Sequence, residues 1–126
     1  EGCAEGDCGA CTIAIQSGLG KVEAVNSCLM LVPQLDGMSV VTVEGLSAPD
    51  EAMHPVQQAI VDKHAAQCGF CTPGILMSWT QLREEEPNAD EARIRDVLSG
   101  HICRCTGYDG IVKAALDVFG DVFGKN

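Results

Sequence analysis

The sequence predicts an α+β fold in which a small β-rich region precedes a helical region. Up to about residue 45, short segments rich in β-branched residues alternate with turn residues, as strands and their connections do. From residue 54 onward, apolar residues recur with helical spacing. Residues between these patterns have the Gly, Ser and Pro content of a linker. We therefore predict a β domain over residues 1–45, a linker over 46–53 and a helical domain over 54–126.

The β region is expected to form three short strands, because its β-branched runs are separated by residues that favour turns. In chain order, the predicted elements are a strand over residues 12–16, a turn over 17–20, a strand over 21–25, a turn at Asp36-Gly37 and a strand over 39–43. Strands this short suit a small sheet beside a loop that carries three cysteines.

The helical region is expected to form a bundle of four helices with short connections. Apolar residues three or four positions apart mark one face of each helix. These residues are Val56, Ala59 and Ile60 in the first helix, Ile75, Leu76, Trp79 and Leu82 in the second, Ile94, Val97 and Leu98 in the third, and Ile111, Ala115, Val118 and Val122 in the fourth. The first helix is expected to run to about Gln67, and Thr72 is the predicted N-cap of the second.

Charge and hydropathy limit the possible partners. The chain of 126 residues has a formal net charge of −10. This charge weighs against nucleic acid and against anionic membranes, because both attract basic surfaces. No apolar run approaches the roughly 18 residues that a membrane-spanning helix needs. We therefore expect neither a nucleic-acid partner nor a membrane span.

The eight cysteines allow three interpretations: disulfides, structural zinc sites and iron–sulfur clusters. Eight cysteines in 126 residues fall below the roughly 8–10% that is typical of disulfide scaffolds. The cysteines also gather in local groups, whereas disulfide frameworks tend to spread them along the chain. Metal-binding interpretations are therefore favoured.

The first group has the spacing of a plant-type 2Fe-2S site. Cys3, Cys8 and Cys11 form a C-x4-C-x2-C pattern, and Cys28 follows at a distance. The loop over residues 2–12 is rich in glycine, which allows positive φ and lets backbone N–H groups approach sulfur closely. Zinc sites more often use two CxxC-like pairs. The spacing therefore favours a cluster.

The second group consists of two close pairs, Cys68-x2-Cys71 and Cys103-x-Cys105, each followed by a helix-start signal. Four thiolates at two helix N-termini would place negative charge against the positive ends of helix dipoles. Zinc can use such pairs as well. Two alternatives to a fixed redox subunit stay open: a zinc-stabilised interaction module without redox activity, and a free-standing ferredoxin shuttle.

Four motifs in this order carry a resemblance to a known family. They are G-C-x2-G-D-C-G-A-C-T at residues 2–12, N-S-C-L at 26–29, Q-C-G-F-C-T-P-G at 67–74 and C-R-C-T-G-Y at 103–108. The chain resembles the small 2Fe-2S subunit of the xanthine dehydrogenase family of molybdenum hydroxylases, of the carbon monoxide dehydrogenase small-subunit type. The resemblance implies part of a plant-ferredoxin-like β-grasp domain, lacking its first strands and helix, and then a four-helix 2Fe-2S domain.

The resemblance also implies which residues bind two 2Fe-2S clusters. The cluster farther from molybdenum would be bound by Cys3, Cys8, Cys11 and Cys28, and the nearer cluster by Cys68, Cys71, Cys103 and Cys105. Gln67 would contact the pterin, with Cys105 on the side nearest to it. Members of the family place the molybdenum–pterin centre and FAD on other subunits or domains.

By the same resemblance, the chain is the electron-transfer subunit of a molybdenum-dependent oxidoreductase and has no substrate chemistry of its own. Electrons would pass singly from a molybdenum-binding large subunit, through both clusters, to an FAD-binding medium subunit or to a cytochrome. The expected assembly is a dimer of heterotrimers. The expected compartment is the cytoplasm, or the periplasm if a preceding segment carries a twin-arginine signal.

Side chains outside the cysteine motifs receive structural interpretations. The three histidines share no metal-ligand spacing, and His101 stands where many relatives have Asn. Trp79 lies on an apolar helix face and is expected in the core. Arg104 is a candidate for cluster charge balance or a subunit contact. Tyr108 is expected to pack or to hydrogen-bond at the helix start.

Overall fold

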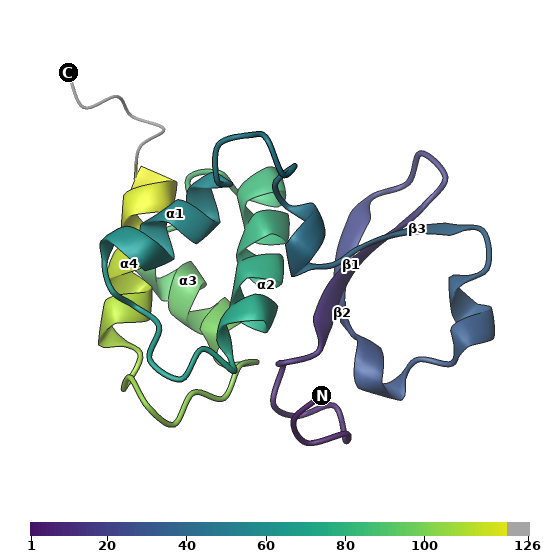
Figure 1. Cartoon of the computed structure of the whole chain (residues 1–126), viewed down its shortest axis with the longest axis horizontal. Coiled ribbons are helices and arrows are strands. Elements are labelled where there is room, and N and C mark those ends of the chain that lie inside the picture. The colour runs from purple at the N-terminus through teal and green to yellow at the C-terminus, as the bar shows by residue number, and fades with distance from the viewer. Residues whose placement is uncertain (121–126) are drawn as a thin grey trace.

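The structure, a computed structural model, describes residues 1–120 and has two parts that lie side by side (Figure 1). Over these residues, one part contains a three-stranded antiparallel sheet and the other contains four α-helices. The α+β prediction is therefore confirmed. Val122, predicted on the last helix, lies outside the described residues. Within residues 1–120, no helix combines the length and the apolar character needed to cross a membrane.

The sheet is built around a central strand. β1 (Thr12–Ser17) pairs with β2 (Val22–Asn26) along one edge and with β3 (Met38–Val41) along the other. Ala14 and Ile15 are both buried, although successive residues of a strand point to opposite faces. Both faces of β1 are therefore covered, which makes it the rigid element that leads out of the first cysteine loop.

Three short 3₁₀ helices follow the strands. They are η1 (Ser27–Leu29), η2 (Val32–Leu35) and η3 (Val43–Gly45). The third strand is shorter than the predicted range of 39–43, because the N–H of Gly45 bonds to the carbonyl of Thr42 at 2.9 Å and turns the chain there.

The helices are α1 (Pro55–Asp62), α2 (Thr72–Glu85), α3 (Glu91–Leu98) and α4 (Asp109–Gly120). Their apolar faces meet in one core, in which Trp79 has no exposed surface, so its predicted core position is confirmed. α2 lies between the sheet and the other helices and contacts both (Figure 1). This helix therefore connects the two parts of the molecule.

Two helix boundaries differ from the prediction. α1 ends at Asp62, short of the predicted end near Gln67, because the backbone turns at His64 with a φ of +49°. A residue in this left-handed conformation commonly ends a helix. The N-cap of α2 is Cys71 rather than Thr72, so a cysteine itself occupies the helix start.

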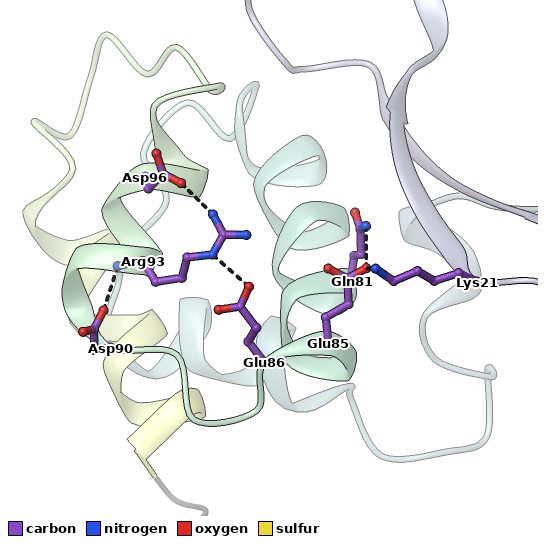
Figure 2. A network of polar contacts seen from close by, with 7 residues as sticks. All are labelled: Lys21, Gln81, Glu85, Glu86, Asp90, Arg93 and Asp96. Carbon is purple, nitrogen blue, oxygen red and sulfur yellow. Dashed lines mark hydrogen bonds and ion pairs between the residues drawn. The ribbon is translucent and has the colours of Figure 1, made fainter.

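Polar contacts attach the β1–β2 hairpin to the side of α2, as Figure 2 shows. The N–H of Ala24 in β2 donates to Oε1 of Gln81 at 2.7 Å. Lys21 forms an ion pair with Glu85 at 2.6 Å, and Nε2 of Gln81 donates to the same carboxylate at 3.1 Å. The two parts therefore contact each other through specific groups as well as through apolar packing.

Candidate metal centres

The first cysteine group lies on the N-terminal loop, residues 1–11, and in η1. Three residues of this loop have positive φ: Ala4 (58°), Gly6 (83°) and Gly9 (74°). Alternation of ordinary and left-handed residues turns successive backbone N–H groups toward one concave side. The glycines supply a conformation that side chains otherwise disfavour.

Backbone N–H groups of this site point at cysteine sulfurs. Those of Glu5 and Cys8 donate to Sγ of Cys3 at 3.5 and 3.4 Å, and that of Cys28 donates to Sγ of Cys11 at 3.4 Å. Such donors favour the thiolate, which is the form that binds a metal. The N–H groups of Glu5 and then Cys8 lower the pKa of Cys3 to about 7.

The strongest thiol–thiol interactions of this group join its cysteines two by two, and Cys3 also acts on Cys28. The thiol of Cys3 interacts with that of Cys8, and the thiol of Cys11 with that of Cys28, whose pKa it raises. In a 2Fe-2S cluster each iron takes two protein ligands, so a two-by-two arrangement fits such a cluster. Among residues 1–120, no three His, Cys, Asp or Glu side chains converge as a single-ion site would require.

The end of β2 holds the first loop in place. Nδ2 of Asn26 donates to the carbonyl of Gly6 at 2.7 Å. The hydroxyl of Ser27 donates to the carbonyl of Cys11, also at 2.7 Å. These two hydrogen bonds therefore hold the loop at Gly6 and at Cys11, and they fix the residues that surround the sulfurs.

The second cysteine group lies where two loops meet at the start of α2. Cys71 is buried at the N-cap, Cys68 precedes it on an exposed loop, and Cys103 and Cys105 come from the connection between α3 and α4. These thiols are also paired, Cys68 with Cys105 and Cys71 with Cys103. In Figure 1 both loops lie along the same lower edge as the N-terminal loop.

Burial and hydrogen bonding shift the thiol pKa values of the second group in opposite directions. Burial, together with the neighbouring Cys103 thiol, raises the pKa of Cys71 to about 11. Burial acts in the same direction on Cys103, but hydrogen bonds from Thr106 and Cys105 outweigh it and lower the pKa. Oγ1 of Thr106 lies 3.0 Å from the Cys103 sulfur. The pKa of Cys71 is therefore raised although this thiol lies at a helix N-terminus.

Direct contacts join the two groups, and the sequence did not reveal them. The N–H of Ile102, next to Cys103, donates to the carbonyl of Cys8 at 3.0 Å. The first loop also packs against α2 without room for a side chain, because a Cβ on Gly74 would lie 2.0 Å from the carbonyl oxygen of Gly9. One hydrogen bond therefore connects the backbones of the two cysteine groups.

The second group opens onto an exposed face with both polar and apolar side chains. Gln67 and Cys105, the residues predicted to face the pterin, are exposed, as is Arg104. Phe70 and Ile102 are each 59% exposed, which is high for large apolar side chains. Exposed apolar residues grouped beside a polar site are typical of protein contacts.

Sequence reasoning missed the placement of two side chains beside Cys103. His101 is buried, with only 5% of its surface exposed. Tyr108 has a φ of +67°, and its Oη accepts from the N–H of Cys103 and donates to the carbonyl of His101, both at 2.8 Å. The backbone N–H of Tyr108 donates to Oγ1 of Thr106 at 3.1 Å. Nearness to a cysteine motif was the one sequence signal for either residue.

Comparison with known proteins identifies relatives that include a 2Fe-2S domain family and two oxidoreductases. A family model described as a 2Fe-2S binding domain matches residues 42–116. The nicotine 6-hydroxylase small subunit of Paenarthrobacter nicotinovorans is 50% identical over 125 residues, which are 99% of this chain and 72% of that protein. Xanthine dehydrogenase 1 of Arabidopsis thaliana is 44% identical over 119 residues, which are 90% of this chain and 9% of that protein.

Solved structures agree in fold. Quinoline 2-oxidoreductase from Pseudomonas putida 86 superposes with a TM-score of 0.83 and 40% identity, over 94% of this chain and 70% of that chain. The aldehyde oxidoreductase from Desulfovibrio gigas superposes with a TM-score of 0.85 and 34% identity, over 99% of this chain and 14% of that one. The arrangement of sheet and helices described above is therefore shared with both oxidoreductases.

Proposed function

Since the chain belongs to the iron–sulfur subunits of the xanthine dehydrogenase family of molybdenum hydroxylases, we propose that it transfers electrons through two 2Fe-2S clusters. The gathering of its eight thiols in two groups, with backbone N–H groups directed at the sulfurs of Cys3 and Cys11, carries this proposal. Each group offers two pairs of sulfurs, which is the ligand pattern of two irons. When bound, a 2Fe-2S cluster accepts and donates one electron at a time.

The ligands follow from the two groups. One cluster would be held by Cys3, Cys8, Cys11 and Cys28, and the other by Cys68, Cys71, Cys103 and Cys105. The N–H donors to sulfur in the first group, and the buried position of Cys71 in the second, give the two sites different surroundings. Hydrogen bonds and burial both tune cluster potentials. We therefore expect the two clusters to differ in potential.

The exposed face beside the second group supports a direction for electron transfer. We propose that this face docks on a molybdenum-binding large subunit, with Gln67 and Cys105 toward the pterin. Phe70 and Ile102 support docking, because their exposed apolar surface would be removed from water. The Ile102–Cys8 hydrogen bond then offers a backbone connection toward the first group.

The acceptor side and the assembly are further parts of the proposal. Electrons would leave the first cluster for FAD on a medium subunit, or for a cytochrome. The relative from Paenarthrobacter nicotinovorans is named a small subunit, which supports a multi-subunit assembly. We propose a dimer of heterotrimers, in which substrate chemistry belongs to the large subunit.

The domain division is proposed on the same basis. Residues 1–45 would be the C-terminal part of a plant-ferredoxin-like β-grasp domain, residues 46–53 a linker and residues 54–126 a four-helix 2Fe-2S bundle. The three-stranded sheet beside the first loop and the shared core of α1 to α4 support this division.

Two other functions make different predictions. A zinc-stabilised interaction module would be colourless and would contain no sulfide. A free-standing ferredoxin shuttle would not copurify with a large subunit. Paired thiols with N–H donors favour a cluster over zinc, and the exposed Phe70 and Ile102 favour a fixed subunit over a shuttle.

The test is the iron and acid-labile sulfide content of the full chain purified without air. We expect about four of each per chain, since two 2Fe-2S clusters contain that many. Substitution of Cys28 by Ser should remove one cluster and leave the second one bound. Zinc without sulfide would contradict the proposal and favour the structural module.

A further inference from the structure

His101 is the one histidine among residues 1–120 that is buried, and it lies between the two cysteine groups. Its Nε2 is 2.8 Å from the hydroxyl of Ser78 in α2. Its Nδ1 is buried and has no hydrogen-bond partner of good geometry. A buried polar atom left in this state costs free energy, so its placement calls for a reason.

The ring of His101 lies directly against the first cysteine loop. A Cβ on Gly9 would be 2.5 Å from Nδ1 of His101 and 2.4 Å from the carbonyl oxygen of Gly100. The φ of Gly9 is +74°, so both the conformation and the space require glycine. Gly9 stands between Cys8 and Cys11, and the ring therefore touches the peptide that joins two ligand positions.

The two ring nitrogens of His101 face different neighbours, Nε2 the hydroxyl of Ser78 and Nδ1 the Gly9 peptide. A neutral imidazole has one donor nitrogen and one acceptor nitrogen. If Nε2 accepts from the hydroxyl of Ser78, Nδ1 carries the proton and faces the Gly9 peptide.

The backbone of residues 101–103 is hydrogen-bonded within the loop that carries Cys103 and Cys105. The carbonyl of His101 accepts from Oη of Tyr108, which also accepts from the N–H of Cys103. The next residue, Ile102, donates to the carbonyl of Cys8. His101 is therefore fixed to the second group by its backbone, while its ring is fixed to α2 and meets the first group.

We propose that His101 is a positioning residue that sets the separation of the two iron–sulfur sites by holding the Gly9 peptide against the loop of the second site. This inference rests on the proposed function of the chain. An apolar side chain would fill the same space against Gly9 but would leave the hydroxyl of Ser78 without its partner. The polar ring fixes direction as well as distance, since hydrogen bonds are directional.

Two variants of the full chain separate this role from simple packing. H101F keeps an aromatic ring of similar shape and removes both nitrogen atoms. S78A keeps the ring and removes its anchor on α2. Iron and sulfide content is measured first for each protein, because it shows whether both clusters are bound.

The decisive readout is the spin–spin interaction between the two reduced clusters, measured by electron paramagnetic resonance. Dipolar coupling depends on the distance and the orientation of the two spins, so it reports the separation directly. We expect H101F and S78A to bind both clusters with a weakened or broadened splitting, because each loses the hydrogen bond between Ser78 and the ring. A second readout is amide exchange of the segment that contains Ile102, which should be about five- to tenfold faster in H101F.

The outcomes distinguish the two proposals. A wild-type chain without two clusters would contradict the proposed function and, with it, this inference. A wild-type chain with two clusters and an H101F variant of unchanged splitting and unchanged exchange would overturn the inference alone. If H101F fails to bind clusters, S78A decides: an altered splitting supports the role of the ring, and an unaltered splitting overturns it.

Discussion

The Cys3 thiol shows how single hydrogen bonds prepare a ligand. Backbone N–H groups lower its pKa from the ordinary value of 9.0 to about 7. Because the folded pKa is the lower one, the stabilisation of the folded apo chain is present above about pH 9 and is lost as the pH falls through about 7. In the apo chain, we expect alkylation of Cys3 by iodoacetamide to follow an apparent pKa near 7, measured by mass spectrometry. The same thiol in urea is the control, and identical profiles in the two states would contradict the prediction.

Gly74 shows how one missing side chain lets two parts of the molecule meet. Alanine there should destabilise the chain by about 1–3 kcal/mol, because its Cβ would lie 2.0 Å from the carbonyl oxygen of Gly9. Helix propensity alone would favour alanine by up to about 1 kcal/mol. Urea unfolding measures the difference.

The matched control is Gly110, which also lies in the first turn of a helix. A Cβ there would meet Ala65 at an ordinary distance of 3.5 Å. Gly110→Ala should leave the free energy of unfolding within about 0.5 kcal/mol of the wild type or raise it slightly. Equal effects of the two substitutions would show that the contact between Gly74 and Gly9 has no energetic weight.

At the scale of elements, α2 organises both parts of the chain. Its N-terminus holds a cysteine of the second group, and its side contacts the β1–β2 hairpin through Gln81 and Glu85 (Figure 2). Gln81→Ala should cost about 1–2 kcal/mol of unfolding free energy, because the part-buried N–H of Ala24 loses its acceptor.

Lys21→Ala tests the ion pair of the same contact and serves as the comparison. The Lys21 side chain is 70% exposed, so the pair is well screened by water and salt. We expect a smaller loss of stability than for Gln81→Ala, and one that disappears at high salt. If Lys21→Ala were the more damaging change, surface charge rather than the Ala24–Gln81 hydrogen bond would hold the hairpin.

At the scale of the whole molecule, all three cysteine-bearing loops lie along one edge, and the face beside the second group is open (Figure 1). If that face docks on the large subunit, Phe70→Ser and Ile102→Ser should each weaken the complex about tenfold or more, equivalent to about 1.4 kcal/mol. Titration of the purified large subunit with the iron–sulfur chain would measure the affinities.

Leu19→Ser is the control for this prediction. Leu19 is fully exposed in the β1–β2 turn, at the opposite end of β1 from the first cysteine loop. The substitution should leave the affinity for the large subunit unchanged. A comparable loss for Leu19→Ser would place the contact elsewhere or make it nonspecific.

Local patterns predicted most of the elements. β1 lies close to its expected range, and α2 and α3 contain the apolar residues predicted to mark them, since apolar periodicity and turn residues act over a few neighbouring positions. The end of α1 was misplaced, because a left-handed residue such as His64 leaves no strong mark on the sequence. The two groups of cysteines were likewise readable from spacing, and the thiols within each group do face one another.

The sequence by itself determined the family and the order of sheet and helices, and it predicted the ligand residues, because these depend on residue type and short spacing. Only the tertiary structure decided how the two groups are paired, joined and buried. The Ile102–Cys8 hydrogen bond, the contact of Gly9 with Gly74 and the position of His101 each bring together residues far apart in the chain. Such contacts are specified by the packing of α2 against the sheet and by the loops around it, and no local pattern encodes them.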